Sequence, residues 1–223
     1  MICIVDYGMG NLRNVLRACR EIGAEAAVSS DSAILSKVDA MILPGVGAFG
    51  EAMRRIESLG LRKVILDHAT NGKPLLGVCL GMQILYAESE ESPGVEGFGL
   101  VAGRVRRFTG PLKVPHIGWN DVQPTGNSSL FEGAQDSAVF YFDHSYYVER
   151  TPETTAVTSY GTEFAASMQS GTISGVQFHP EKSQTAGLGL LRRFAAPVPD
   201  RGSNSTHPLT LPLLHLKERG KGG

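Results

Sequence analysis

The feature that most constrains the fold of this 223-residue chain is a cysteine, Cys79, held between Gly77 and Gly81 at the end of a short apolar run. The residues before it are typical of a buried strand, and those after it recur at helical spacing: Leu75, Leu76 and Val78, then Met82, Leu85 and Tyr86. A tight turn from strand to helix strains the residue at the corner, and flanking glycines leave room for the crossing chain. The pattern therefore predicts a nucleophile elbow with Cys79 as the nucleophile.

A buried structural cysteine is the alternative interpretation of Cys79, because burial is the commonest fate of an isolated cysteine. The two flanking glycines and the switch from strand to helix favour the nucleophile. At the start of a helix, unpaired N–H groups and the helix dipole also stabilise a thiolate.

The first half of the sequence alternates apolar runs with helical stretches. We expect strands at 2–5, 26–29, 40–43 and just before Cys79, with helices at 12–22, from Asp31, at 51–56 and at 61–69. Strands rich in Ile, Val and Leu that are linked by helices are typical of an α/β fold with a doubly wound, largely parallel sheet flanked by helices. Ligands bind at the carboxyl ends of such strands, so the loops 8–11 and 44–50 should converge with Cys79 at one edge.

The second half of the sequence has a different character, with glycines, prolines and short alternating stretches. It predicts added strands, some of them antiparallel, at 100–108, 138–142, 155–160, 164–169 and 172–178, followed by a helix at 183–194. We therefore expect one domain over residues 1–196. The composition of residues 197–223 is typical of a linker and predicts a largely disordered tail.

The charge balance of the chain limits its partners. It has 21 Lys and Arg against 22 Asp and Glu, with no long basic cluster, which predicts binding to neither nucleic acid nor membrane. Three widely spaced cysteines and the absence of a signal-peptide pattern predict a cytoplasmic protein. The loop 8–11 has only two of the three glycines of a dinucleotide fingerprint, so no nucleotide cofactor is expected. No metal site is expected either.

A cysteine nucleophile needs a base, and the base needs an orienting group. Residues two apart on an extended segment project from one side, so His179 and Glu181 can lie next to each other, and Pro180 keeps His179 out of helical geometry. A strand at 173–178 should deliver them to the edge where Cys79 lies. This predicts His179 as the base and Glu181 as its orienting group, against the alternative of an ordinary surface turn.

Hydrolysis of an acyl group also needs donors for the oxyanion. The backbone N–H of Leu80, directly after the nucleophile, is one candidate. The segment Gly45, Val46 and Gly47 supplies the other, because its glycines let the backbone turn N–H groups inward. Gln83 lies one helical turn after Cys79, where its amide can recognise a polar group of the substrate.

Taken together, residues 77–83 and 179–181 resemble the class I, or triad, glutamine amidotransferases. Four further segments, 44–49, 115–120, 144–147 and 177–183, are similar to the glutaminase subunits of imidazole glycerol phosphate synthases. The resemblance covers residues 1 to about 195. The cysteine and histidine motifs are shared by the whole superfamily, whereas the segments 44–47 and 115–120 are more specific.

The resemblance implies an activity, a substrate site and a partner. Cys79 would attack the side-chain amide of glutamine, His179 would shuttle the proton, and Ser145 and Tyr146 would bind the substrate with Gln83. No cofactor is implied. Ammonia would pass to a barrel-shaped cyclase subunit of the synthase, in a heterodimer that works in histidine biosynthesis. The residues that would face this partner are Asn11, Trp119, Asn120 and Tyr141.

Two departures from the family pattern and three alternatives stay open. Asp143 stands where an apolar residue is expected, and residues beyond 197 have no counterpart. The chain could be the glutaminase subunit of another amidotransferase, such as an anthranilate or aminodeoxychorismate synthase, although Val46 and Met82 differ from their pattern. It could also be a non-catalytic regulatory module or an independent cysteine hydrolase.

Overall fold

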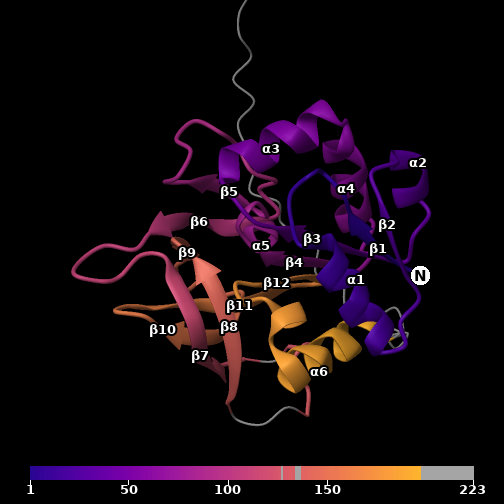
Figure 1. The fold of residues 1–223 in the computed structure, drawn as a ribbon. Coiled ribbons are helices and arrows are strands. Elements are labelled where there is room, and N and C mark those ends of the chain that lie inside the picture. The colour runs from indigo at the N-terminus through magenta and orange to yellow at the C-terminus, as the bar shows by residue number, and fades with distance from the viewer. Residues whose placement is uncertain (127, 134–136, 197–223) are drawn as a thin grey trace, which may run out of the picture.

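The computed structural model describes residues 1–126, 128–133 and 137–196, so the predicted tail at 197–223 lies outside the described residues. One sheet has nine strands in the order β2-β1-β3-β4-β12-β11-β10-β7-β8, and a second has the order β5-β6-β9 (Figure 1). Their bounds are β1 (Ile2–Val5), β2 (Ala26–Ser29), β3 (Ala40–Gly45), β4 (Leu75–Cys79), β5 (Tyr86–Ser89), β6 (Val101–Arg107), β7 (His116–Pro124), β8 (Ala138–His144), β9 (Tyr146–Val148), β10 (Thr154–Ser159), β11 (Glu163–Ser170) and β12 (Ile173–Val176).

The half of the large sheet from β2 to β12 is parallel and covered on both faces. Helices α3 and α4 lie on one face and α1 and α6 on the other (Figure 1). The helices and their bounds are α1 (Leu12–Glu21), α2 (Ser32–Leu35), α3 (Phe49–Ser58), α4 (Leu61–Thr70), α5 (Leu80–Gln83), the 3₁₀ turn η1 (Pro180–Lys182) and α6 (Gln184–Ala195). None of the helices in the described ranges is long and apolar enough to cross a membrane.

The continuous apolar sequence of these strands follows from burial on both faces. Within β1, Cys3 and Val5 join the core beneath α3 and α4, while Ile2 and Ile4 join the core beneath α1 and α6. Side chains that alternate between two covered faces leave no place for a polar residue. The parallel, doubly wound arrangement predicted from the sequence is therefore confirmed.

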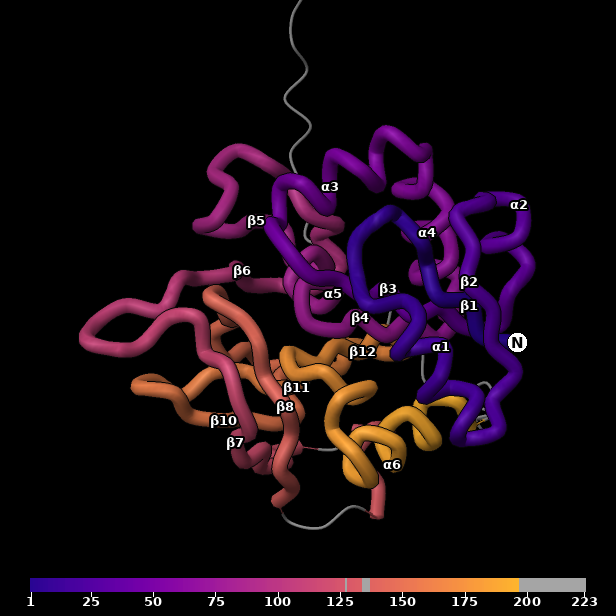
Figure 2. The backbone as a smooth tube through the Cα atoms, in the orientation of Figure 1, coloured from indigo at the N-terminus to yellow at the C-terminus, as the bar shows by residue number. Residues whose placement is uncertain are grey.

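The remaining strands of the large sheet are antiparallel. Strand β12 pairs in parallel with β4 on one side and antiparallel with β11 on the other, so it is the point where the sheet changes direction. Figure 2 shows β4 and β12, far apart in sequence, lying side by side. The added antiparallel strands of the second half are confirmed. Strands β8, β10 and β11 extend the first sheet, whereas β6 pairs with β5 and β9 in the second.

The segment after Cys79 differs from the sequence-based prediction, and three strands, β5, β7 and β9, were not predicted. The helix α5 ends at Gln83, because the carbonyls of Ile84 and Leu85 accept hydrogen bonds from the N–H groups of Phe98 and Leu100. Strand β7 escaped prediction because its inward face carries polar side chains, among them His116, whose hydrogen bonds are satisfied inside the protein.

Candidate active site

Cys79 sits at the junction of β4 and α5 in a strained backbone conformation. Its φ of 55° and ψ of −112° are unusual for a residue with a side chain. The two glycines are sterically required, because a Cβ at Gly81 would lie 1.7 Å from the carbonyl oxygen of Leu43, and one at Gly77 would lie 2.6 Å from that of Gly81. This is the geometry expected of a nucleophile elbow.

The predicted base and its orienting group lie together at the end of β12. The Nδ1 of His179 lies 2.9 Å from the Oε1 of Glu181, and both side chains are 2 % exposed. The backbone of His179 is fixed as well, since its N–H donates to the carbonyl of Tyr141 and its own carbonyl accepts from the hydroxyl of Ser183. The imidazole is therefore held in one orientation.

The other ring nitrogen of His179, Nε2, is buried and has no hydrogen-bond partner within the described part of the chain. Burial alone lowers the pKa of His179, but a negative charge on the neighbouring Cys79 sulfur, together with Glu181, raises that pKa to about 10. An imidazolium next to a thiolate is the ion pair that activates cysteine nucleophiles.

The sulfur of Cys79 has two polar neighbours besides His179. It lies 3.8 Å from the backbone oxygen of Asp143 and 3.6 Å from the side-chain Nε2 of Gln177. Asp143 is exposed, and the contact with the sulfur is made by its backbone oxygen, so a polar side chain at this position is compatible with the site.

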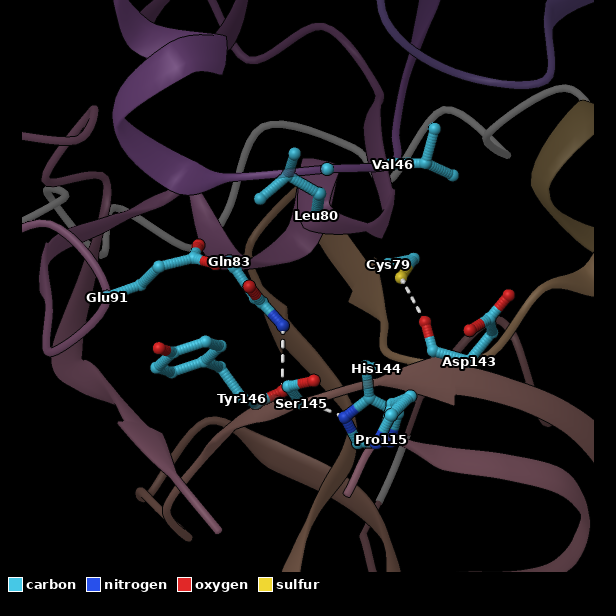
Figure 3. A pocket seen from close by; sticks show the side chains of 11 residues that line it. Val46, Cys79, Leu80, Gln83, Glu91, Pro115, Asp143, His144, Ser145 and Tyr146 are labelled. Carbon is cyan, nitrogen blue, oxygen red and sulfur yellow. Dashed lines mark hydrogen bonds between the residues drawn. The ribbon is translucent and has the colours of Figure 1, made fainter.

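A cavity of about 430 Å³ opens directly over the sulfur. The predicted substrate residues Gln83, Ser145 and Tyr146 line it together with Cys79 (Figure 3). The remaining lining residues are Val46, Gly47, Leu80, Glu91, Pro115, Asp143 and His144. The cavity thus combines a nucleophile with amide, hydroxyl and carboxylate groups, which suits a small polar substrate.

The predicted oxyanion residues lie in two positions. Val46, Gly47 and Leu80 border the cavity. Gly45 is instead buried at the end of β3, where it pairs with Cys79 of the neighbouring strand β4. Gly47 has a φ of +100°, which few residues other than glycine adopt, so the loop after β3 depends on it.

Two histidines, His116 and His144, form a buried pair next to the cavity. The Nδ1 of His144 lies 2.8 Å from the carbonyl of Tyr146, and its Nε2 lies 3.0 Å from the Nδ1 of His116. Burial lowers the pKa of His116 to about 4 and that of His144 to about 3. Both are therefore neutral near pH 7, and each has one fixed tautomer.

Acidification should destabilise the protein through this pair. Between the unfolded value near 6.5 and the lower folded values, the unfolded chain binds protons that the folded chain does not, so stability is full above pH 6.5 and falls as the pH decreases towards 4. Each histidine contributes a slope of at most about 1.4 kcal/mol per pH unit. Urea unfolding at pH 7 and at pH 5.5 measures this change in the free energy of unfolding. The variant His116→Gln should show a shallower slope, and an equal slope would contradict the expectation.

The predicted partner-facing residues differ in orientation: some face outward and others face into the protein. Strands β7 and β8 place Ile117, Trp119, Val139 and Tyr141 on one outer face, and the ring centroids of Trp119 and Tyr141 are 5.9 Å apart. Asn120 alternates to the inner face, where its amide donates to the carbonyl of Ser159. Asn11 is half-buried just before α1.

Sequence reasoning assigned no role to two polar residues of the site. Gln177 precedes His179 by two positions, and the alternation along the strand could have placed it on the same side. Glu91 gave no such signal, because it reaches the cavity from the segment after β5 by tertiary packing, where its Oε2 accepts from the N–H of Phe49 at 2.7 Å. Within the described ranges, no three His, Cys, Asp or Glu side chains are grouped as a metal site requires.

The chain matches a known protein family and several relatives over most of its length. The family model "Glutamine amidotransferase class-I" matches residues 3–197. The chain is 53% identical to imidazole glycerol phosphate synthase subunit HisH of Methanothermobacter thermautotrophicus, with 87% of this chain and 97% of that one covered. It is 46% identical to the subunit of the same name from Symbiobacterium thermophilum, with 94% and 99% covered.

The fold of this chain resembles those of several solved structures. A crystal structure described as a glutamine amidotransferase matches with a TM-score of 0.70 and 22% identity, covering 87% of this chain and 97% of that chain. A putative GMP synthase subunit from Thermoplasma acidophilum matches with a TM-score of 0.65 and 23% identity, covering 87% and 91%.

Proposed function

The chain belongs to the class-I glutamine amidotransferases, and on that premise we propose that it hydrolyses glutamine as the glutaminase subunit of an imidazole glycerol phosphate synthase. The observation that carries the proposal is the elbow cysteine next to the buried pair His179 and Glu181, at the floor of a cavity with polar walls. The relatives named above favour histidine biosynthesis over the anthranilate and aminodeoxychorismate alternatives. We place this function in the cytoplasm, as the sequence predicts.

The proposed reaction has two steps. The thiolate of Cys79 attacks the carboxamide carbon of glutamine, and the imidazolium of His179 gives its proton to the leaving nitrogen, so that ammonia departs and a thioester remains. His179 then takes a proton from water, the resulting hydroxide attacks the thioester, and glutamate leaves as the thiolate forms again. Glu181 holds the ring of His179 in the orientation that both steps need.

Two sets of groups support the proposed site. The backbone N–H groups of Leu80 and of the loop Val46 and Gly47 border the cavity next to the sulfur, where an oxyanion would form. Gln83, Ser145 and Tyr146 offer hydrogen-bonding groups for the amino-acid end of the substrate. Glu91 supplies a carboxylate, the natural counterpart of the α-ammonium group of glutamine.

The variant Glu91→Gln should bind glutamine more weakly. The substitution keeps an oxygen that can accept from the N–H of Phe49 but removes the negative charge that faces the substrate. Loss of one charge-assisted hydrogen bond should raise KM by roughly 10–100-fold and leave kcat nearly unchanged. Steady-state kinetics with Glu88→Gln, an exposed neighbour outside the cavity, gives the control. An unchanged KM would remove Glu91 from the substrate site.

The partner in this proposal is the barrel-shaped cyclase subunit, which would form a heterodimer with this chain and receive the ammonia. An exposed apolar patch supports a protein interface on β7 and β8: Ile117 is 58%, Trp119 49% and Val139 45% exposed. Aromatic residues of this kind often dominate binding energy.

The test of the proposed function measures glutamate and ammonia released from glutamine by the chain alone and with the cyclase subunit. We expect hydrolysis in the mixture, co-elution of the two subunits, and at least tenfold weaker binding by Trp119→Ala. The exposed residue Leu59, which directly follows α3 and lies outside β7 and β8, offers a control: Leu59→Ala should leave binding unchanged. Absence of glutamine hydrolysis under both conditions would reject the proposal.

A further inference from the structure

A fully buried amide next to the nucleophile has no role in the mechanism above. Gln177 is 0% exposed, and its Nε2 lies 3.6 Å from the Sγ of Cys79, within the range of a hydrogen bond to sulfur. Gln177 does not line the cavity, so its contact is with the nucleophile and not with a bound substrate.

The orientation of this amide follows from its neighbours. The Nε2 of Gln83 lies 2.9 Å from the backbone oxygen of Tyr146 and 3.0 Å from the Oε1 of Gln177. Because a carbonyl oxygen only accepts hydrogen bonds, Gln83 must turn its NH₂ group towards Tyr146. The same NH₂ group then requires the oxygen of Gln177, and the nitrogen of Gln177 is left to face the sulfur.

The carbonyl of Tyr146 is itself held in place from the other side. It accepts a hydrogen bond from the Nδ1 of His144, whose Nε2 accepts from the Nδ1 of His116. The Nε2 of His116 lies 3.4 Å from the side-chain nitrogen of Asn120. Every donor in this series of hydrogen bonds meets an acceptor, so one set of tautomers and amide orientations satisfies all the groups from Asn120 to Cys79.

We propose that Gln177 is a positioning residue for the nucleophile: its amide donates a hydrogen bond to the Cys79 sulfur and stabilises the thiolate, and the hydrogen bonds from His144 through Tyr146 and Gln83 hold the amide in this orientation. The inference rests on the proposed function, in which the thiolate attacks glutamine. A donor on the sulfur favours its charged form independently of the ion pair with His179.

The test is the pH profile of alkylation of the full chain by iodoacetamide, which reacts with the thiolate. Removing the donor with Gln177→Met should move the midpoint of the profile up by about one pH unit, so that alkylation at a pH below both midpoints slows about tenfold. Gln177→Glu has nearly the same shape but places a carboxylate next to the sulfur, and it should move the midpoint further. A role in packing alone predicts the opposite order, since Glu is the closer isostere.

Two comparisons separate this effect from general damage. Gln169→Met removes a partly buried amide that bonds to Ser128 and Gly171, away from the sulfur, and should leave the midpoint unchanged. In glutamine hydrolysis, Gln177→Met should lower kcat with little change in KM, because the residue touches the nucleophile and not the cavity.

The proposal is overturned if circular dichroism shows that both Gln177 variants are folded and their alkylation profiles keep the wild-type midpoint. If neither variant folds, the side-chain amide proton of Gln177 in the ¹⁵N-labelled wild type should shift with pH at the same midpoint as alkylation, and a constant shift would overturn it. His144→Phe tests the supporting hydrogen bonds and should also raise the midpoint, and an unchanged midpoint would reject that part. Alkylation needs neither glutamine nor a partner, so these outcomes are distinct from failure of the proposed function.

Discussion

Replacing Cys79 with alanine should abolish the release of ammonia from glutamine while leaving ammonia-dependent synthesis by the complex intact. The thiol performs only the amide chemistry in the proposed mechanism, so its loss should lower glutamine-dependent turnover by roughly 10⁴–10⁶-fold. The measurement is formation of product by the heterodimer, with glutamine or with an ammonium salt as the nitrogen source. The ammonium-dependent rate should stay within about twofold of the wild type.

A second buried cysteine gives the control for this experiment. Cys19 is fully buried in α1 and does not line the cavity, so Cys19→Ala removes a buried sulfur from the core and leaves the cavity wall intact. This variant should keep glutamine-dependent turnover and lose only about 1 kcal/mol of stability. Glutamine-dependent synthesis at a normal rate in Cys79→Ala would refute the assignment of the nucleophile.

The variant Gly81→Ala should fail to fold stably. A Cβ at this position would lie 1.7 Å from the backbone oxygen of Leu43, and neither β3 nor α5 can move away without breaking the pairing of β3 with β4. We expect a loss of more than about 4 kcal/mol, a large part of the stability of a domain. The expected drop in Tm is roughly 8–16 °C, or no folded protein at all.

Gly189 is the matched control for this substitution. It lies in α6, where the nearest atom to a new Cβ is the end of the Arg193 side chain at 3.5 Å. Alanine there should be neutral or stabilise the helix by up to about 1 kcal/mol. Equal Tm values for Gly81→Ala and Gly189→Ala would show that the elbow has room that the structure does not provide.

The fold was predictable from sequence wherever the buried residues of an element recur with a regular spacing. Strands covered on both faces, such as β1 and β3, are continuous apolar runs, and the helices between them have clear amphipathic spacing. Strand β7 has no such pattern, because His116 and Asn120 face inward and are stabilised by hydrogen bonds to partners far away in sequence. The short length of α5 is likewise set by backbone contacts with residues 97–100.

The candidate site divides in the same way. The elbow and the pair His179 and Glu181 are local patterns, in which spacing alone limits where the side chains can lie. The places of Glu91 and Gln177 depend on how distant segments pack, and residue type alone gave no reason to choose them over the other acids and amides of the chain. Sequence therefore predicted the nucleophile, the base and the orienting carboxylate of Glu181, but assigned no role to Glu91 or Gln177.

The position of β12 between β4 and β11 has a consequence for the growing chain. Cys79 and Gln177 are 98 residues apart, and within the described residues the strand that brings His179 to the sulfur is the last one to be synthesised. Contacts of such long range form late, after most of the loop entropy has been lost. A nascent chain therefore carries an ordinary thiol through most of translation, and the reactive ion pair appears only once the domain is nearly complete.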